Sequence, residues 1–162
     1  MKKICRKANE KDKEEVFALY RSLVGTYGCA WTEDYPSESD VAADIEQQAL
    51  YVLCGESGEI MGAAALVTSE EINHLVCWDK TIQKPCELVR IGIKEKYHNQ
   101  GLAKELLYYM EEDAVKRGFD GMQFLVSKTN PKALALYDGM KFKRVGETYM
   151  YEIHWFCYER KF

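Results

Sequence analysis

The sequence has few prolines, no paired cysteine motif and no long hydrophobic run. Three prolines in 162 residues exclude a proline-rich or collagen-like chain. The six cysteines are scattered, without a CxxC pair, which is typical of reduced thiols rather than of a disulfide framework. The longest apolar stretch, residues 60–67, is far shorter than the roughly 20 residues of a membrane helix. Because no apolar segment follows the basic start as in a signal peptide, we expect a cytoplasmic protein.

The charge balance is slightly acidic. Lys and Arg number 22 and Asp and Glu number 26, which gives a formal net charge of −4. This argues against the broad basic surface that nucleic-acid binding usually requires, so no nucleic-acid or membrane partner is expected. A chain of 162 residues with 47% hydrophobic residues is long enough for one core, and we predict a single domain over residues 1–162.

Hydrophobic periodicity predicts strands that first form hairpins and then alternate with helices. Strands are expected at 3–7, 49–54, 59–67, 86–93, 122–126, 142–147 and 155–161. Helices are expected at 10–24, 40–48, 101–117 and 131–139. The helix over 101–117 has the clearest apolar stripe, and Gly118 follows it as a stop. This order predicts a mixed α/β sheet rather than a fully parallel one.

The segment from Ile91 to Lys104 is the most informative part of the sequence, because a strand there runs through a short loop into the longest helix. The first amides of a helix have no internal partner, and the helix dipole adds positive potential at that end. Gly101 lets an anion approach the backbone closely, and Ala103 keeps the next turn small. The segment therefore predicts a phosphate-binding helix start, although a plain strand–loop–helix connection has the same appearance.

This segment resembles the pyrophosphate-binding motif of the GNAT superfamily of N-acetyltransferases. The family motif is Arg or Gln, two residues, Gly, one residue, then Gly or Ala, and it falls on residues 98–103. The family's downstream pattern matches Asn130, Ala133, Leu136, Tyr137 and Phe142. The resemblance is strong over residues 87–142 and weak before them. Two positions depart from it: His98 replaces Arg or Gln, and Lys141 replaces Gly.

The resemblance implies a GNAT-like fold with a mixed, mostly antiparallel sheet of seven strands and four helices, splayed between the fourth and fifth strands. It implies acetyl-CoA as the acyl donor and no metal. We expect the pantetheine arm to pair with the strand as an added strand, and Gly92 and the loop after Ile93 suggest a bulge that opens the slot. The expected cofactor-binding residues are Ile91, Gly92, Ile93, His98, Asn99, Gln100, Gly101, Leu102, Ala103, Lys104 and Asn130.

Tyr137 and Glu87 are the expected catalytic residues. A phenol is protonated at neutral pH, so by its position in the matched motif Tyr137 would give a proton to the departing thiolate; a buried core tyrosine is the alternative. Glu87, which has the strand parity of Ile91 and Ile93, would deprotonate the acceptor, directly or through a water. A plain surface carboxylate is the alternative. Asn130 would also cap the helix that begins at Pro131.

The acceptor-binding residues are expected in the first long loop, where Trp31 and Tyr35 lie beside acidic residues. Such a group suits a cationic amine, and a solvated loop with one buried tryptophan is the alternative. The spacing of His74, Cys77 and Cys86 is irregular, so no metal site is expected. The aromatic segment 149–162 has the alternation of a strand that could support a homodimer.

The predicted function is transfer of an acetyl group from acetyl-CoA directly to a primary amine of a small molecule. Two alternatives are a non-catalytic acyl-CoA-binding module and a protein or peptide N-acetyltransferase. Replacement of Arg or Gln by His98 is expected to weaken cofactor binding without abolishing it, because backbone amides of residues 99–103 would hold most of the pyrophosphate. The acceptor itself does not follow from the sequence.

Overall fold

In a computed structural model, which describes residues 2–68 and 70–162, one sheet has the strand order β1-β2-β3-β4-β5-β7-β6. The strands are β1 (Ile4–Lys7), β2 (Leu50–Cys54), β3 (Ile60–Val67), β4 (Pro85–Ile93), β5 (Gly121–Ser127), β6 (Lys143–Met150) and β7 (Ile153–Lys161). Neighbouring strands are antiparallel except β4 and β5, which are parallel. The expected mixed, mostly antiparallel sheet of seven strands is confirmed.

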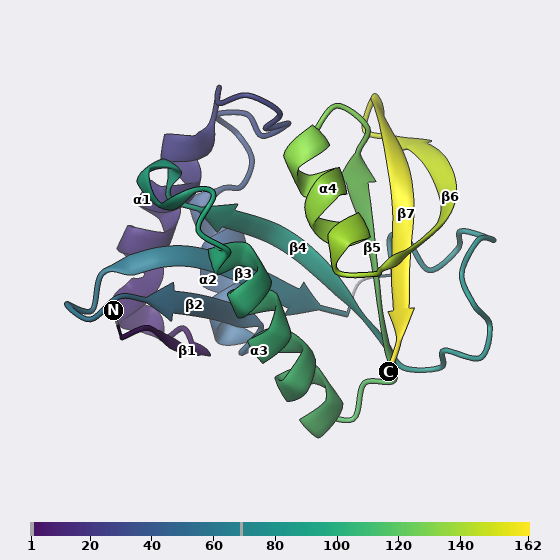
Figure 1. The fold of residues 1–162 in the computed structure, drawn as a ribbon, viewed down its shortest axis with the longest axis horizontal. Helices are drawn as coiled ribbons and strands as arrows, with labels where there is room; N and C mark the ends of the chain where they lie inside the picture. The colour runs from purple at the N-terminus through teal and green to yellow at the C-terminus, as the bar shows by residue number, and fades with distance from the viewer. Residues whose placement is uncertain (1, 69) are drawn as a thin grey trace.

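Helices cover both faces of the sheet (Figure 1). They are α1 (Lys13–Leu23), α2 (Glu38–Glu46), α3 (Leu102–Lys116) and α4 (Pro131–Gly139), with short 3-10 helices η1 (Glu10–Asp12) and η2 (Glu95–Tyr97). The apolar stripe of α3 and the ring of Tyr137 on α4 lie in one core cluster with side chains of β4, β5 and β7. A second cluster joins α1 and α2 to β2 and β3 on the opposite face. No helix within the described residues has the length and apolar character needed to cross a membrane.

Side-chain caps fix where the helices begin. Ser37 and Asp40 form a reciprocal capping box, so α2 begins two residues earlier than the periodicity predicts. Asn9 and Asp12 form the same kind of box at η1, and the first turn of the expected helix over 10–24 is 3-10 rather than α-helical. Gly118 lies two residues beyond the end of α3 and takes φ +91°. Glycine adopts this left-handed conformation without the steric cost that other residues have.

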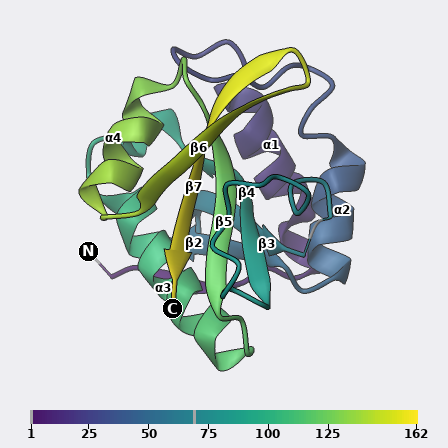
Figure 2. The same ribbon diagram turned by 90° about the vertical axis from the view of Figure 1, so that its right-hand side faces the viewer.

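The connection between β3 and β4 covers the sheet on the side opposite α4. Ile72 and Trp78 in this connection pack on Cys157 of β7 in a third core cluster, together with Leu125 of β5. Leu125 alternates along β5 with Phe124 and Val126, which contact the α3–α4 side. The connection therefore lies beside the place where β4 and β5 meet (Figure 2).

Candidate active site

The two parallel strands β4 and β5 pair along only part of their length. Their register runs from Pro85 opposite Gly121 to Glu87 opposite Gln123 and then stops. Figure 1 shows the strands diverging from that end. The expected splay between the fourth and fifth strands is thus confirmed. The remainder of β4 turns an unpaired backbone edge toward β5, and such an edge can accept an extended ligand as an added strand.

A bulge in β4 lies at Arg90 and Ile91. Val89 pairs with Ala65 and Gly92 pairs with Ala63, so two residues of β4 oppose one residue of β3. Arg90 takes φ +51°, a left-handed conformation that is unusual for a side chain of this size. The expected position of the bulge, at Gly92 or after Ile93, is therefore wrong.

Gly92 instead allows the first helix to approach the sheet. A Cβ atom at Gly92 would lie 2.7 Å from Cδ1 of Leu23 and 3.3 Å from Cη2 of Trp31. Any larger residue would push α1 and the α1–α2 connection away from β4. Gly92 therefore allows close packing of α1 and the α1–α2 connection on β4, and its expected contact with the cofactor stays a prediction.

The bulge changes which way the side chains of β4 face. Cys86, Leu88, Ile91 and Ile93 all contact the core on the α3–α4 side, although their numbers differ in parity. Glu87 alternates with Cys86 and Leu88 and so faces the α1–α2 side. The expectation that Glu87 shares a face with Ile91 and Ile93 is wrong, because the extra residue at the bulge shifts the alternation between them.

Glu87 lines a small hollow next to the last paired position of the two strands. Asn73 and Gln123 also line this hollow, whose volume is about 10 Å³. A space of this size with polar walls is about what one water molecule needs. The arrangement agrees with a carboxylate that acts through a water, and the catalytic role of Glu87 stays a prediction.

Arg90 joins the bulge to the α1–α2 side of the site. Its Nε and Nη2 donate to the two carboxylate oxygens of Asp44 at 2.8 and 2.7 Å, and its Nη1 donates to the hydroxyl of Tyr35 at 3.0 Å. Trp31 packs edge-on against Tyr20, with ring centroids 5.1 Å apart. Both expected acceptor residues, Trp31 and Tyr35, therefore lie close to β4.

The start of α3 presents unpaired amides. The first helical hydrogen bond runs from the amide of Glu105 to the carbonyl of Gly101 at 3.1 Å, so the amides of residues 102–104 have no partner within the helix. Gly101 takes φ +76°, and a Cβ atom there would meet nothing within 4 Å. An anion can therefore approach these amides freely, and the helix start suits a phosphate group.

His98 points back to its own loop. Its Nε2 donates to the carbonyl of Ile93 at 2.7 Å, which leaves Nδ1 as an acceptor when the ring is neutral. A neutral ring in this position has no donor left for a phosphate. Asn99 and Gln100, the next two expected contacts, are exposed, and Asn99 takes φ +63°.

Asn130 lies where two distant segments meet at the open end of the gap. Its Oδ1 accepts from the amide of Ala133 at 3.2 Å and caps α4, as expected. A Cβ atom on Gly28, in the α1–α2 connection, would lie 3.2 Å from the same oxygen. The α1–α2 connection therefore packs directly against the start of α4. The expected contact of Asn130 with the cofactor stays a prediction.

Tyr137 is buried among aromatic rings. Its ring centroid lies 4.7 Å from that of Phe124 and 5.8 Å from those of Phe142 and Tyr158. Burial raises the pKa of Tyr137 above its usual value, so the hydroxyl keeps its proton throughout the physiological range. Within residues 2–68 and 70–162 the hydroxyl has no hydrogen-bond partner, which leaves it able to donate to a ligand.

Tyr151 and Glu71 belong to the site region and were not found from the sequence. Tyr151 and Glu152 form the two-residue turn between β6 and β7 with φ +55° and +61°, and the hydroxyl of Tyr151 donates to Glu71. This hydrogen bond, with smaller effects of Glu87 and Tyr35, raises the pKa of Tyr151 to about 12. The hairpin tip therefore lies near the acceptor side of β4 (Figure 2).

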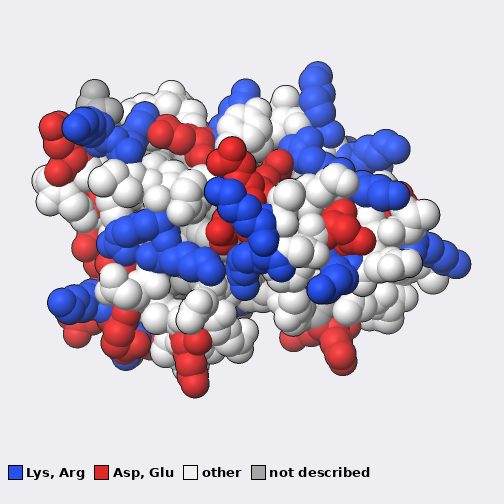
Figure 3. Space-filling model, turned by 90° about the horizontal axis from the view of Figure 1, so that it is seen from below, with Lys and Arg blue, Asp and Glu red and all other residues white. Residues whose placement is uncertain are grey.

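The last features of the site region are its surface charge and its possible metal ligands. On the face that Figure 3 shows, Lys and Arg side chains lie among Asp and Glu side chains. No group of three or more His, Cys, Asp or Glu side chains in the described parts of the chain is placed to hold a metal ion.

Three solved structures similar to this chain are described as acetyltransferases. A GNAT-family acetyltransferase from Streptococcus agalactiae 2603 is 17% identical, with a TM-score of 0.83 over 99% of this chain and 95% of that chain. The PaiA N-acetyltransferase from Thermoplasma acidophilum, solved in complex with coenzyme A, is 20% identical, with a TM-score of 0.76 over all of both chains. The ribosomal-protein-S18-alanine N-acetyltransferase from Escherichia coli is 16% identical, with a TM-score of 0.75 over 99% of this chain and 94% of that chain.

The family itself follows from the sequence match. No curated protein sequence matches this chain significantly. The family model described as "Acetyltransferase (GNAT) family" matches residues 16–142, which contain the splayed strands, the start of α3 and both expected catalytic residues. With its sheet order and its parallel β4–β5 pair, the chain belongs to the GNAT family of acetyltransferases.

Proposed function

We propose that this protein transfers an acetyl group from acetyl-CoA directly to a primary amine of a small molecule. The observation that carries the proposal is the open start of α3 beside the gap between β4 and β5. The amides of residues 102–104 would hold the pyrophosphate, and the unpaired edge of β4 would receive the pantetheine arm. The likeness to a neighbour solved with coenzyme A supports this assignment.

Acetyl-CoA supplies an activated thioester, and the residues of the chain handle charge and protons around it. A backbone amide on the free edge of β4 would stabilise the negative charge that develops on the carbonyl oxygen. Glu87 would take a proton from the acceptor ammonium through the water-sized hollow beside it. The hydroxyl of Tyr137, protonated and without a partner among the described residues, would donate to the sulfur as it leaves.

The acceptor side favours a small cationic molecule. The α1–α2 connection packs at Gly28 against Asn130 and so reaches across the open end of the gap, and the hydrogen bond between Tyr151 and Glu71 brings the β6–β7 hairpin across from the other side. These two contacts narrow the approach for a folded protein. Tyr35 and Asp44 hold the guanidinium of Arg90, and the exposed Glu33 and Asp34 beside them would attract an ammonium group.

The proposal is tested with a panel of primary amines and free-N-terminus peptides, acetyl-CoA, and release of free thiol as the signal. We expect turnover of at least one small amine and an acetylated product in the mass spectrum. Calorimetric titration with CoA alone belongs to the same experiment. CoA binding without turnover of any amine would favour a binding module, and turnover of peptides alone would assign a protein acceptor.

A further inference from the structure

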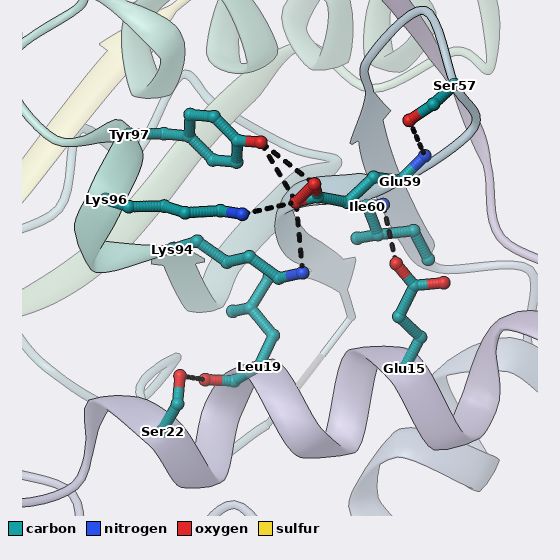
Figure 4. A network of polar contacts seen from close by, with 9 residues as sticks. All are labelled: Glu15, Leu19, Ser22, Ser57, Glu59, Ile60, Lys94, Lys96 and Tyr97. Carbon is teal, nitrogen blue, oxygen red and sulfur yellow. Dashed lines mark hydrogen bonds and ion pairs between the residues drawn. The ribbon is translucent and has the colours of Figure 1, made fainter.

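The carboxylate of Glu59 binds three side chains of the loop between β4 and α3 (Figure 4). The hydroxyl of Tyr97 donates to its two oxygens at 2.9 and 3.0 Å, and the Nζ atoms of Lys94 and Lys96 each lie 3.4 Å from Oε2. The hydrogen bond from Tyr97 and the two lysines hold the pKa of Glu59 below its usual range. Glu59 is therefore charged and fully engaged near neutral pH.

Glu59 belongs to a different part of the sheet from the loop that it binds. It directly precedes β3, at the end of the β2–β3 turn, whereas residues 94–101, here named the donor loop, lead into the start of α3. The amide of Lys94 donates to the carbonyl of Met61 in β3 at 2.8 Å, whereas the main-chain bonds further along the donor loop are local, as in the amide of Tyr97 to the carbonyl of Lys94 at 2.9 Å. Beyond Lys94 these local bonds shape the loop without joining it to the sheet, so the Glu59 contacts of Lys96 and Tyr97 provide a second anchor.

The donor loop has open space on its other side. A hollow of about 280 Å³ separates it from α1, lined by Leu19 and Ser22 of the helix and by Lys94 and Lys96 of the loop. Because α1 does not pack tightly against the loop there, the loop has room to shift when its anchor is removed. Figure 4 shows the lysines reaching past this space to Glu59.

We propose that Glu59 is a positioning residue for the donor site, which holds the donor loop so that the α3 amides face the pyrophosphate. This inference rests on the proposed function. A purely electrostatic role predicts the opposite sign, because removing a negative charge and freeing two lysines would strengthen the attraction of a phosphate. The direction of the affinity change therefore separates the two roles.

The test compares Glu59→Gln with Glu56→Gln by calorimetric titration with CoA. Glu56 lies in the same turn and is exposed, so both variants lose one negative charge near the loop. For Glu59→Gln we expect CoA affinity to fall about fivefold, the sum of two partly exposed ion pairs and a weakened hydrogen bond. For Glu56→Gln we expect parental affinity. With an acceptor in hand, Glu59→Gln should raise KM for acetyl-CoA and leave kcat within about twofold.

A second background tests whether the effect passes through the donor loop. When Lys94→Gln and Tyr97→Phe are already present, Glu59→Gln should add little further loss, as coupled contacts require. Equal CoA affinity in Glu59→Gln and Glu56→Gln, or tighter binding by Glu59→Gln, would overturn the inference while leaving the proposed function standing. A parent protein that binds no CoA would overturn both.

Discussion

The ring of Tyr137 is part of the core, and its hydroxyl is not used in a hydrogen bond within the described residues. Three aromatic rings surround it, and its hydroxyl finds no partner within the described residues. The hydroxyl is not one of the fully buried polar atoms without a partner in the described residues, so it reaches the surface, where a ligand atom can meet it. The neighbouring Tyr158 is different, because its hydroxyl donates to Asp138 at 2.8 Å and accepts from Arg144.

Tyr137→Phe is expected to lower kcat by about 10²-fold while CoA affinity stays close to that of the parent. The ring and its packing remain, and only the donor to the departing sulfur is lost; a positioned acid contributes roughly 10²–10⁴-fold, and a thiolate leaves readily. The free energy of unfolding should stay equal or rise, because no protein hydrogen bond is broken. Steady-state kinetics with the amine found in the screen and urea denaturation measure the two effects.

Tyr158→Phe is the matched control for that substitution. It removes a hydroxyl from the same aromatic cluster, but one with protein partners, so stability should fall by about 1 kcal/mol with kcat near that of the parent. If Tyr137→Phe keeps kcat within about threefold of the parent, Tyr137 is a packing residue and another group protonates the sulfur.

Helix α3 places two glycines with the same backbone conformation at its two ends. Gly101 at its start takes φ +76° and Gly118 beyond its end takes φ +91°, and a Cβ atom at either position meets nothing within 4 Å. Any side chain at either position therefore has room but is strained by the backbone. The difference between them is that Gly101 lies at the unpaired amides and Gly118 does not.

Gly101→Val should weaken CoA binding at least about tenfold, because a branched side chain would occupy the space through which the pyrophosphate approaches. Gly118→Val should carry a similar conformational cost of roughly 1–2 kcal/mol and leave CoA affinity unchanged. Thermal unfolding and calorimetric titration of both variants separate strain from obstruction. Similar CoA affinity in Gly101→Val and the parent would remove the helix start from the donor site.

Local signals were enough for most elements and for part of the site. The strand, loop and glycine around Gly101, the cap at Asn130 and the helix of Tyr137 all lie within short stretches of sequence, where spacing predicts them. Arg90, Tyr151 and Glu71 depend on contacts between distant segments, since Arg90 binds Tyr35 and Asp44 at separations of 55 and 46 residues and Tyr151 binds Glu71 at 80. The bulge was misplaced because no glycine marks it; the one signal was a charged residue inside an apolar strand.

At the scale of the whole molecule, the edge strand β1 is tied to the start of the first helical layer by one carboxylate. Asp12 accepts from Nη1 and Nη2 of Arg6 at 2.7 and 3.0 Å and from the amide of Asn9 at 2.8 Å. The hydrogen bonds from Arg6, more than any other cause, hold the pKa of Asp12 below its usual range. The side chain of Asp12 is 10% exposed and that of Arg6 is 37% exposed, so solvent screens the pair in part.

Asp12→Asn is expected to lower the free energy of unfolding by about 1–3 kcal/mol near pH 7. Because the folded pKa is below the unfolded value of about 3.9, the stabilisation is complete above that unfolded value and disappears as pH falls through the folded pKa. The difference in the free energy of unfolding between the parent and Asp12→Asn should therefore disappear on acidification. Urea denaturation at pH 7 and below pH 4 measures it.

Glu10→Gln provides the comparison for that prediction. Its carboxylate lies in the same short helix but is 75% exposed, 3.5 Å from Lys13, and an exposed pair of this kind contributes at most about 1 kcal/mol. If the difference in the free energy of unfolding between the parent and Asp12→Asn is the same at the two pH values, the Asp12 side chain stabilises the fold through its shape rather than its charge.

The bulge at Arg90 divides β4 into two parts whose side chains alternate in opposite phase. On one side of it, even-numbered residues contact the α3–α4 core, and on the other side odd-numbered residues do. A substitution changes the side chain at one position of β4 but does not change the face of the sheet on which that side chain lies. Insertion of one residue between Glu87 and the bulge would bring Glu87 to the face of Ile91 and Ile93. Substitution of Glu87 would therefore change the proposed base, whereas insertion of one residue would change the face on which that base lies.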